Sequence, residues 1–449
     1  MQTSFPNIWI QIPEIYLPKE NTNRNKRAVV ACDQYTSQPE YRESVKTYTE
    51  GNPSTLNIIF PEVYLEEETG EERIASIKQH MNQYLSENIL ENKGIWCIYI
   101  DRKTSHSTSR KGLIIALDLE KYDYNKGSQT LIRATEGTIL DRLPPRIKIR
   151  EGAPLESPHI MVLIDDPEKI VIEPLANNIQ NYTKLYDFDL MMEGGHITGY
   201  QINDETTINN IAARLEKLTD KEIFKNKYGV GDELGVLLFA MGDGNHSFAT
   251  AKAIWEEKKQ NLTLEQQKNH PARFALVELN NIHDEGITFE PIHRVIFNIN
   301  NETFFQEMEK YFRNIGSEII IEHYDNKEEV KKNLKPSSKE IHYLWWVNND
   351  GYMILGIKNP KLNLEVGNLQ NFLDLYLKDH PESKIDYVHG EDVTETLWKE
   401  KNNLGLLLPI MNKSDFFKTV IVDGALPRKT FSMGEAEEKR FYLECRKIS

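Results

Sequence analysis

An acid, two glycines, an asparagine and a histidine lie together between an apolar run and a run of helix-forming residues. The stretch is GVLLFAMGDGNHSFATAKAIWEE, residues 235–257. The apolar run predicts a buried strand over 235–241, followed by a turn over 242–246. A helix is expected from about Ser247, with Trp255 on or near its packed face. The order is therefore strand, tight loop, helix.

The start of such a helix can bind an anion. Its first backbone N–H groups have no partner within the helix, and glycines at 242 and 244 let a ligand come close. An alternative is that Asp243 or Asn245 only caps the helix and that Gly242 and Gly244 only form a turn. The loop is neither G-x-x-x-x-G-K-[ST] nor G-x-G-x-x-G, so the two common nucleotide-binding loops are disfavoured.

A second stretch, LIRATEGTILDRLPPRIKIRE at 131–151, concentrates positive charge in a chain whose formal net charge is −15. Phosphoryl transfer needs cations to offset the charge of the moving group and a carboxylate to orient the nucleophile or hold Mg²⁺. Both types occur here, since Glu136 lies among Arg133, Arg142 and Arg146. The alternative is a solvated strand, because RIKIR alternates with period two.

The elements that position these residues follow a mixed pattern. Strands are expected at 94–102, 112–122, 168–175 and 195–202, and then at 273–281 and 286–297. Helices are expected at 72–88, 205–224, 302–316 and 369–379. The sequence predicts a multi-domain α/β (mixed α+β) protein. Polar breaks near 123–129 and 297–302 suggest three segments, 1–126, 127–300 and 301–449.

Composition narrows the class of protein. The acidic net charge disfavours nucleic acid as a partner, because affinity for a phosphate backbone comes mainly from dense Lys and Arg. Three separated cysteines and no C-x-x-C pair indicate neither a disulfide framework nor a structural zinc site. No apolar run approaches the length of a membrane span, so neither a membrane span nor a membrane partner is expected. We expect a cytoplasmic protein.

Three motifs carry a resemblance to a known family. They are the DGNHS loop at 243–247, IHR at 292–294 and PRKT at 427–430. In this order they resemble the domain-of-unknown-function family 1015, whose members commonly have DGHHR, THR and P-x-K-[ST] at these places. The loop also resembles the phosphate-binding loop of the ParB and sulfiredoxin superfamily, which includes free-serine kinases. This resemblance implies that the middle segment has a ParB/sulfiredoxin-like core.

The resemblance implies a phosphoryl-transfer enzyme acting on a small hydroxyl metabolite, with serine or phosphoserine as the best guess. The direction is that of a serine kinase or of a phosphoserine phosphatase, with ATP or ADP as the nucleotide. Glu136 would orient or deprotonate the hydroxyl, Asp243 would hold Mg²⁺, and His246 would donate to phosphate or act as acid or base. The phosphate and substrate contacts would come from a larger set: Gly242, Gly244, Asn245, Ser247, Arg133, Arg142, Arg146, His293, Arg294 and Lys429.

Two departures from the family pattern favour an alternative, a non-catalytic sensor of a nucleotide or phosphorylated metabolite. Ser247 replaces an arginine that would hold phosphate bidentately, and Asn245 replaces a histidine. A phosphate loop without that arginine needs another cation. We expect Arg294 to supply it, with Arg142 or Lys429 as second choices. The oligomeric state is not predicted.

Overall fold

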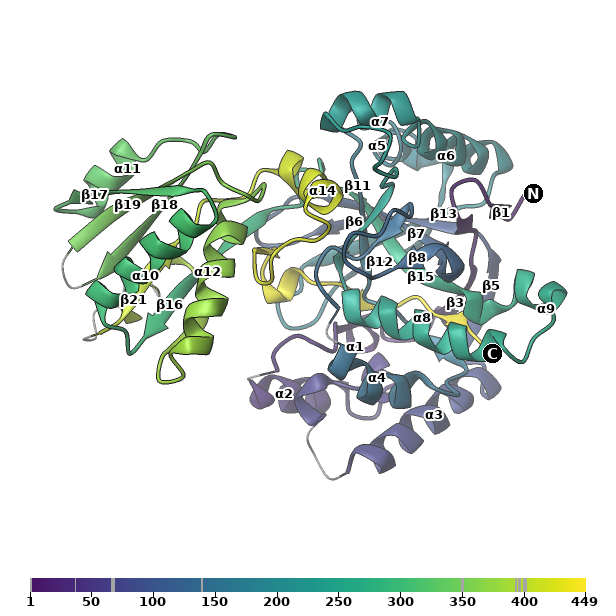
Figure 1. Ribbon diagram of the computed structural model, residues 1–449. Helices are drawn as coiled ribbons and strands as arrows, with labels where there is room; N and C mark the ends of the chain where they lie inside the picture. Colours follow the sequence, from purple (N-terminus) through teal and green to yellow (C-terminus); the bar gives the residue numbers. More distant parts are fainter. Residues whose placement is uncertain are drawn as a thin grey trace. The chain divides into compact units, whose positions relative to one another are not determined.

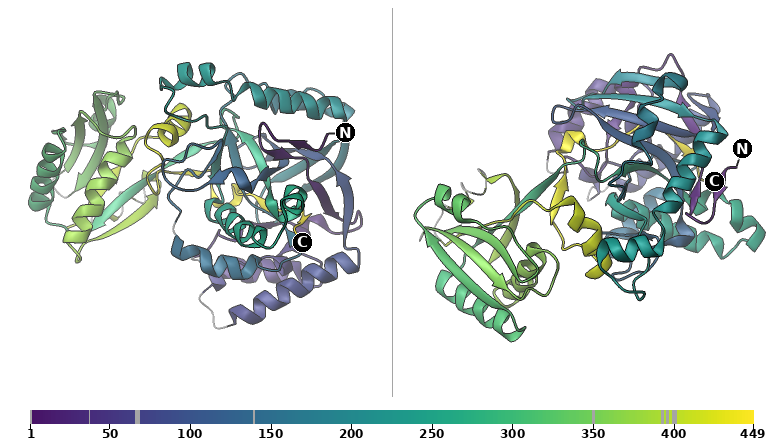
Figure 2. Two further views of the ribbon diagram at one scale, coloured as in Figure 1. Left: turned by 45° about the vertical axis from the view of Figure 1, so that its right-hand side comes forward. Right: turned by 90° about the horizontal axis from the view of Figure 1, so that it is seen from above.

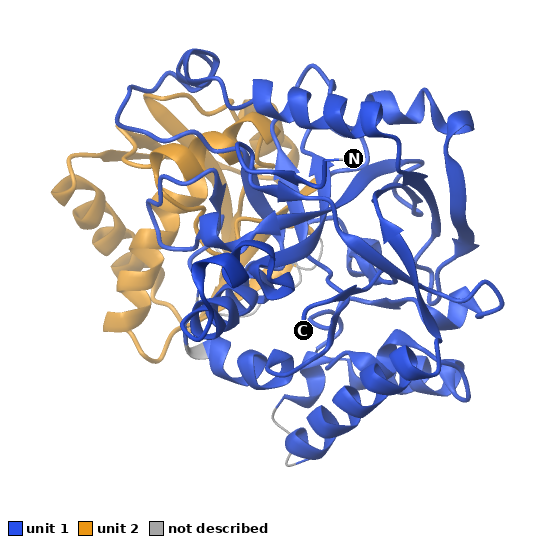
Figure 3. Cartoon of the chain, turned by 90° about the vertical axis from the view of Figure 1, so that its right-hand side faces the viewer, with its two compact units in different colours: residues 1–288, 433–449 blue, residues 289–432 orange. Residues whose placement is uncertain are grey.

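The chain forms two compact units (Figure 3). The computed structural model describes residues 2–36, 38–65, 69–138, 140–348, 351–391, 394, 397–398 and 402–449. Unit 1 comprises Met1–Thr288 and Met433–Ser449, and unit 2 comprises Phe289–Ser432. This division differs from the three consecutive segments suggested by the sequence, because the strands of 1–126 and of 127–288 share one sheet.

An 11-stranded mixed sheet organises unit 1 (Figure 1). Both parallel and antiparallel pairs occur within it, which confirms the mixed α/β class. Its main path is β12 (Thr183–Asp189), β13 (His196–Ile202), β6 (Cys97–Lys103), β7 (Arg110–Asp118), β15 (Phe274–Asn281), β11 (Met161–Ile164), β14 (Phe239–Asp243), β9 (Ile132–Arg133) and β8 (Tyr122–Asp123), with β1 (Ser4–Phe5) and β2 (Ile10–Gln11) beside it.

Unit 1 contains α-helices as well as this sheet. They are α1 (Arg24–Arg27), α2 (Pro39–Thr49), α3 (Gly70–Ser86), α4 (Leu143–Arg150), α5 (Glu173–Ala176), α6 (Glu205–Lys217), α7 (Lys221–Tyr228), α8 (Asn245–Lys259) and α9 (Leu264–Asn269). Apolar side chains of α6, α8 and the sheet form one core cluster, which includes the fully buried Trp255. The predicted packed position of Trp255 is confirmed.

Two expected extended segments are helical or irregular instead. The alternating RIKIR segment belongs to α4, because the two prolines before it occupy the first turn of that helix, where proline needs no N–H partner. The segment 168–175 contains no strand and ends in α5. Expectations for 94–102 and 112–122 are largely met, since β6 and β7 pair antiparallel.

The C-terminal segment returns to unit 1 after unit 2 (Figure 2). Strand β23 (Phe441–Tyr442) pairs with β4 (Val29–Val30), and β24 (Arg446–Lys447) pairs with β10 (Leu155–Glu156). Buried ion pairs join the segment to the sheet, with Arg440 Nε 2.9 Å from Glu278 Oε2 and Arg446 Nε 2.8 Å from Glu156 Oε1. A further pair, β3 (Glu14–Pro18) with β5 (Leu90–Ile95), completes the small sheets.

Unit 2 has its own seven-stranded sheet. Its path is β17 (Glu318–Tyr324), β19 (Gly351–Lys358), β18 (Ile341–Asn348), β21 (Leu404–Leu407), β16 (Phe289–Phe297) and β20 (Lys384–His389), with β22 (Phe431–Met433) beside β16. Its helices are α10 (Asn301–Asn314), α11 (Lys327–Asn333), α12 (Glu365–Asp379) and α14 (Lys413–Val422). Across the described parts of both units, every helix is too short or too polar to span a membrane.

Candidate functional site

The turn between β14 and α8 has the geometry of an anion-binding helix start. Strand β14 ends at Asp243, Gly244 is the N-cap with a left-handed φ of 81°, and the helix begins at Asn245. A Cβ at Gly244 would lie 3.0 Å from Ile160 Cγ1, so the turn needs glycine for conformation and for space. The strand is shorter and later than predicted, and the helix starts two residues before Ser247, because the left-handed cap completes the turn in one residue.

The predicted basic segment lies against this turn. Strand β9 runs parallel to β14, and the chain after it reaches the helix start. The Thr135 N–H donates to Asn245 Oδ1 over 3.1 Å, and the Thr135 hydroxyl donates to Met241 O over 2.6 Å. Glu136 is the next residue and is half-buried. The 131–136 segment and the 242–247 turn are therefore in direct contact.

Two arginines at the start of α4 act on His246: Arg142, the residue before the helix, and Arg146 within it. Helices α4 and α8 pack against each other (Figure 1). Burial lowers the pKa of His246 to about 4, and the positive charges of Arg146 and Arg142 contribute to this, while Asp33 opposes it. Arg146 also donates to Glu62 and, over 2.8 Å, to the carbonyl of Arg142. His246 is consequently neutral near pH 7 and stands in a positive electrostatic environment.

The predicted acid Asp243 is held by two donors. Its Oδ1 accepts the Gly244 N–H over 2.8 Å, and its Oδ2 lies 3.4 Å from Lys439 Nζ. Lys439 comes from the C-terminal segment and was not a candidate in the sequence. Lys439 adds a positive charge beside the turn, and it follows the turn in the sequence, whereas α4 precedes it.

A buried histidine, also missed in the sequence, touches Ser247. His159 Nε2 lies 3.4 Å from Ser247 Oγ and 3.9 Å from Asp33 Oδ2, and His159 Nδ1 lies 2.6 Å from Tyr442 Oη. Burial by itself would raise the pKa of Asp33, but the interaction with the His159 ring, the hydrogen bond from Gln34 and the charge of Lys439 hold that pKa below its usual value. Asp33 therefore faces the turn as an anion.

Arg133 has a structural task that the sequence did not indicate. It is buried and donates to the backbone carbonyls of Thr130 at 2.7 Å and Val236 at 3.1 Å, as well as to that of Gly235. Burial lowers its pKa to about 10. These bonds tie β9 to the loop before β14, so Arg133 positions the strand pair, and its predicted contact with phosphate is withdrawn.

The remaining predicted contacts belong to unit 2. Arg294 is fully buried and donates to Ile292 O, to Gln370 Oε1 at 3.3 Å and to Arg428 O at 3.2 Å. His293 Nδ1 accepts the Leu408 N–H over 3.2 Å. Lys429 has a left-handed backbone, with φ of 55°. The guanidinium of Arg294 donates within its own unit, which disfavours the expectation that it replaces the missing arginine. Arg142 and Lys429, the second choices, stay predictions.

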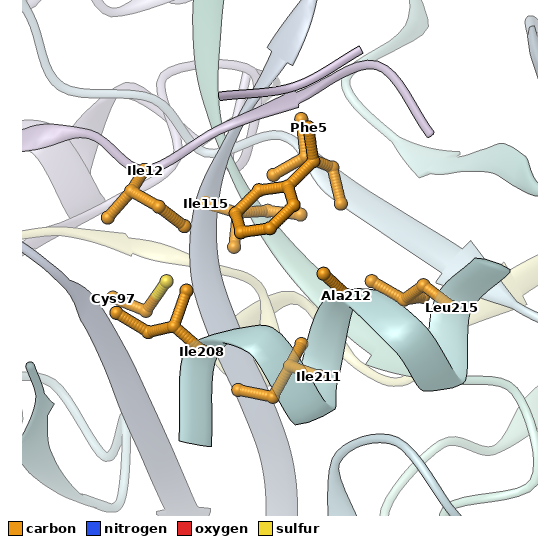
Figure 4. A pocket seen from close by; sticks show the side chains of 9 residues that line it. Phe5, Ile12, Cys97, Ile115, Ile208, Ile211, Ala212 and Leu215 are labelled. Atoms are coloured by element: carbon orange, nitrogen blue, oxygen red, sulfur yellow. The ribbon is translucent and has the colours of Figure 1, made fainter. Parts of the chain in front are cut away.

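The cavities of unit 1 lie apart from this turn. One is a purely apolar space of about 10 Å³ between α6 and the sheet (Figure 4), where Phe5, Cys97, Ile208 and Ile211 point toward one another. A larger cavity of about 230 Å³ lies along the C-terminal half of α8, beside Arg150 and Ile448. Within the described ranges, no group of three or more His, Cys, Asp or Glu residues could hold a metal ion.

Comparison with known proteins gives the family. Residues 15–376 match the model of the family described as "Protein of unknown function (DUF1015)". The chain belongs to the DUF1015 family. The predicted family is confirmed, and the match includes the DGNHS and IHR motifs. The PRKT motif at 427–430 lies outside the matched residues, and it stays a prediction, as does the ParB/sulfiredoxin-like core. No curated protein matches the sequence.

Solved structures give low similarity to this DUF1015 protein. "Free serine kinase in complex with AMP" has a TM-score of 0.37 and 9% identity, covering 78% of this chain and 95% of that one. A mutant of free serine kinase in complex with ADP has a TM-score of 0.38 and 10% identity, with the same coverage. A conserved hypothetical protein from Pyrococcus furiosus has a TM-score of 0.33 and 10% identity, covering 75% and 95%.

Proposed function

We propose that unit 1 binds the phosphate groups of a nucleotide at the start of α8 and transfers a phosphoryl group to a small hydroxyl metabolite, with serine as the first candidate. The observation that supports this most is the meeting of three separate segments at His246 and Asn245. Thr135 bonds to Asn245, Arg142 and Arg146 act on His246, and Lys439 reaches Asp243. Preorganised cations and backbone N–H groups of this kind stabilise a transferring phosphoryl group.

Each side chain then has a chemical role. The Gly244 turn and the first N–H groups of α8 receive a phosphate oxygen, and neutral His246 donates one ring N–H to it. Arg142, Arg146 and Lys439 offset its charge. Glu136 orients the acceptor hydroxyl and takes its proton.

Magnesium is compatible with the carboxylates at this turn. Mg²⁺ is commonly held by one or two carboxylates together with substrate phosphates, and Asp243 and Asp33 offer such oxygens. When bound, the ion would offset the negative charge of the phosphate groups. Asp243 would have to exchange the Lys439 contact at 3.4 Å for the metal.

A thermal-shift screen with ATP, ADP, serine, phosphoserine and Mg²⁺ tests ligand binding, because a ligand that binds only the folded state raises the unfolding temperature. Glu136→Gln tests catalysis. We expect this variant to bind the nucleotide like the parent and to lose transfer to the hydroxyl by about a hundredfold or more. Glu265→Gln, on the exposed helix α9, is the matched control.

The second candidate is a non-catalytic sensor, favoured by Ser247 where the family commonly has arginine. Nucleotide binding without turnover, unchanged in Glu136→Gln, would support the sensor. Failure of every phosphate-containing probe to shift the unfolding temperature would refute both functions. The serine kinase and phosphoserine phosphatase directions are separated by following phosphoserine formation and phosphate release in the same assay.

A further inference from the structure

Ser247 has the surroundings of a nucleophile. It is half-buried in the first turn of α8, and its hydroxyl lies 3.4 Å from His159 Nε2. His159 is only 5% exposed and comes from the segment before β11. A serine hydroxyl becomes nucleophilic when a base within hydrogen-bond reach takes its proton, and such contacts are often longer before substrate binds.

The histidine is oriented by a third group, as a base of this kind requires. Its Nδ1 lies 2.6 Å from Tyr442 Oη, which also accepts the Cys32 N–H over 3.2 Å and contacts the Cys32 side chain. With the Nδ1 proton donated to Tyr442 and the tyrosine proton donated to Cys32 Sγ, Nε2 is the free acceptor that faces Ser247. Asp33, 3.9 Å from Nε2, offsets the positive charge of the protonated ring.

We propose that Ser247 receives the phosphoryl group of the nucleotide and forms a phosphoserine on the enzyme. Ser247 Oγ attacks the terminal phosphorus, and the new O–P bond forms as the phosphoanhydride O–P bond breaks. The nucleotide product leaves with that electron pair, and the Ser247 proton passes to His159 Nε2. The acceptor hydroxyl then attacks the same phosphorus and gives its proton to Glu136. The Ser247 Oγ–P bond breaks as the new O–P bond forms, and Ser247 Oγ takes back the proton held by His159 Nε2. This step rests on the proposed function, because the nucleotide that donates the phosphoryl group is the one proposed to bind at the same turn.

The product is favoured where it forms. A phosphoserine in the first turn of a helix places its negative charge at the positive end of the helix dipole, next to unpaired N–H groups. The guanidinium charges that act on neighbouring His246 and the ammonium of Lys439 beside Asp243 add to this effect. Replacement of arginine by serine at 247 then exchanges a phosphate-binding cation for a phosphate acceptor.

The test uses the full chain with Mg²⁺ and ATP labelled at the terminal phosphoryl, or ADP labelled in the same way. After acid quenching, intact mass should rise by one phosphoryl group, and peptide mapping should place an acid-stable phosphate on Ser247. Ser247→Ala should lose the label. His159→Gln should slow labelling by about a hundredfold or more without changing the nucleotide-induced shift in unfolding temperature. Ser44→Ala, on the exposed face of α2, is the matched control.

Each other outcome overturns the inference. Acid-labile label would indicate a phosphohistidine, at His246 or His159. Turnover by the parent without label, together with normal turnover by Ser247→Ala, would leave the proposed function standing and remove the covalent step. Absence of both nucleotide binding and turnover would remove both. Mapping on the parent protein gives a result even where a variant fails to fold.

Discussion

At the scale of single residues, the unusual feature is a neutral histidine beside two arginines. His246 is partly buried, and the charges of Arg146 and Arg142 add to the effect of burial in lowering its pKa to about 4. A neutral imidazole both donates and accepts, so His246 can hold a phosphate oxygen without adding charge to a site that has cations already. The arginines would offset the negative charge of the phosphate, and the histidine would fix the position of one phosphate oxygen by a hydrogen bond.

The low pKa of His246 makes stability depend on pH. In the unfolded chain its pKa is near the ordinary 6.5, whereas in the fold it is about 4. Between these values the unfolded state binds more protons than the folded state, so the free energy of unfolding falls as pH drops from 6.5 toward 4. Above pH 6.5 this histidine adds nothing to the pH dependence of stability, because it is neutral in both states. His246→Gln should lose less unfolding free energy between pH 7.5 and 5 than the parent in urea titrations. Equal losses in both proteins would contradict the assignment.

Removal of one arginine tests the source of the charge. In Arg142→Ala we expect the pKa of His246, followed by NMR, to rise, because one repulsive cation is gone. Affinity for the best phosphate ligand should fall tenfold or more, equal to about 1.4 kcal/mol. Lys148→Ala, in the adjoining helix α4, is the control, since Lys148 is exposed. An unchanged affinity would place the phosphate elsewhere.

At the scale of elements, the junction of β14 and α8 was predictable, whereas much of its surroundings was not. An apolar run followed by glycines and helix formers indicates strand, turn and helix from local chemistry alone. RIKIR shows the limit of that approach, because a five-residue alternation fits a strand while the preceding prolines start a helix. Boundaries moved by two to four residues because one glycine makes the turn.

The side chains that sequence reasoning missed come from distant segments. Asp33 lies in the polar stretch CDQYTSQPEY, which reads only as a loop, and Lys439 and Tyr442 lie near the C-terminal end. Only the pairing of β23 with β4 brings these ends beside the turn. Nothing local marks a lysine or tyrosine for such a position. The opposite problem affects Arg294, which the sequence did select. Its apolar neighbours bury it, and backbone carbonyls accept its N–H groups.

The turn itself can be tested with two glycines of similar conformation. Gly244 and Gly229 have φ of 81° and 66°, but a Cβ at Gly229 would meet nothing within 4 Å, whereas at Gly244 it would press on Ile160. Gly229→Ala should cost about 1 kcal/mol of unfolding free energy, for the left-handed backbone alone. We expect Gly244→Ala to cost more and to weaken phosphate binding as well. Equal costs and intact binding would show that the close approach at 244 is unimportant.

At the scale of the whole molecule, unit 2 is an insertion into unit 1. The two ends of the insertion meet, since the Gly434 N–H donates to Thr288 O over 3.3 Å. All the side chains assigned to the proposed site belong to unit 1. Unit 2 can therefore be removed from the chain between Thr288 and Gly434, two residues that a hydrogen bond already joins, without removing a residue of the proposed site.

Replacement of 289–432 by a short glycine linker should give a folded unit 1. We expect cooperative thermal unfolding and a nucleotide-induced shift like that of the full chain, because the linker spans ends that are already adjacent. A variant with the same linker that also lacks 433–449 is the contrast. It should not fold, since the buried Glu278 and Glu156 lose their pairs with Arg440 and Arg446. A folded unit 1 that binds no nucleotide would mean that unit 2 supplies part of the binding site.

The return of the C-terminal segment also sets an order of events during synthesis. Unit 2 is continuous in the chain, so residues 289–432 are synthesised before residues 433–449. Unit 1 must wait for these last residues, and until then Arg102 and Arg110 have none of the carbonyl partners at 437–439 that they bind in the finished protein. The inserted unit is thus synthesised before the host unit can be completed, and a product that ends before residue 433 lacks Lys439 and its contact with Asp243.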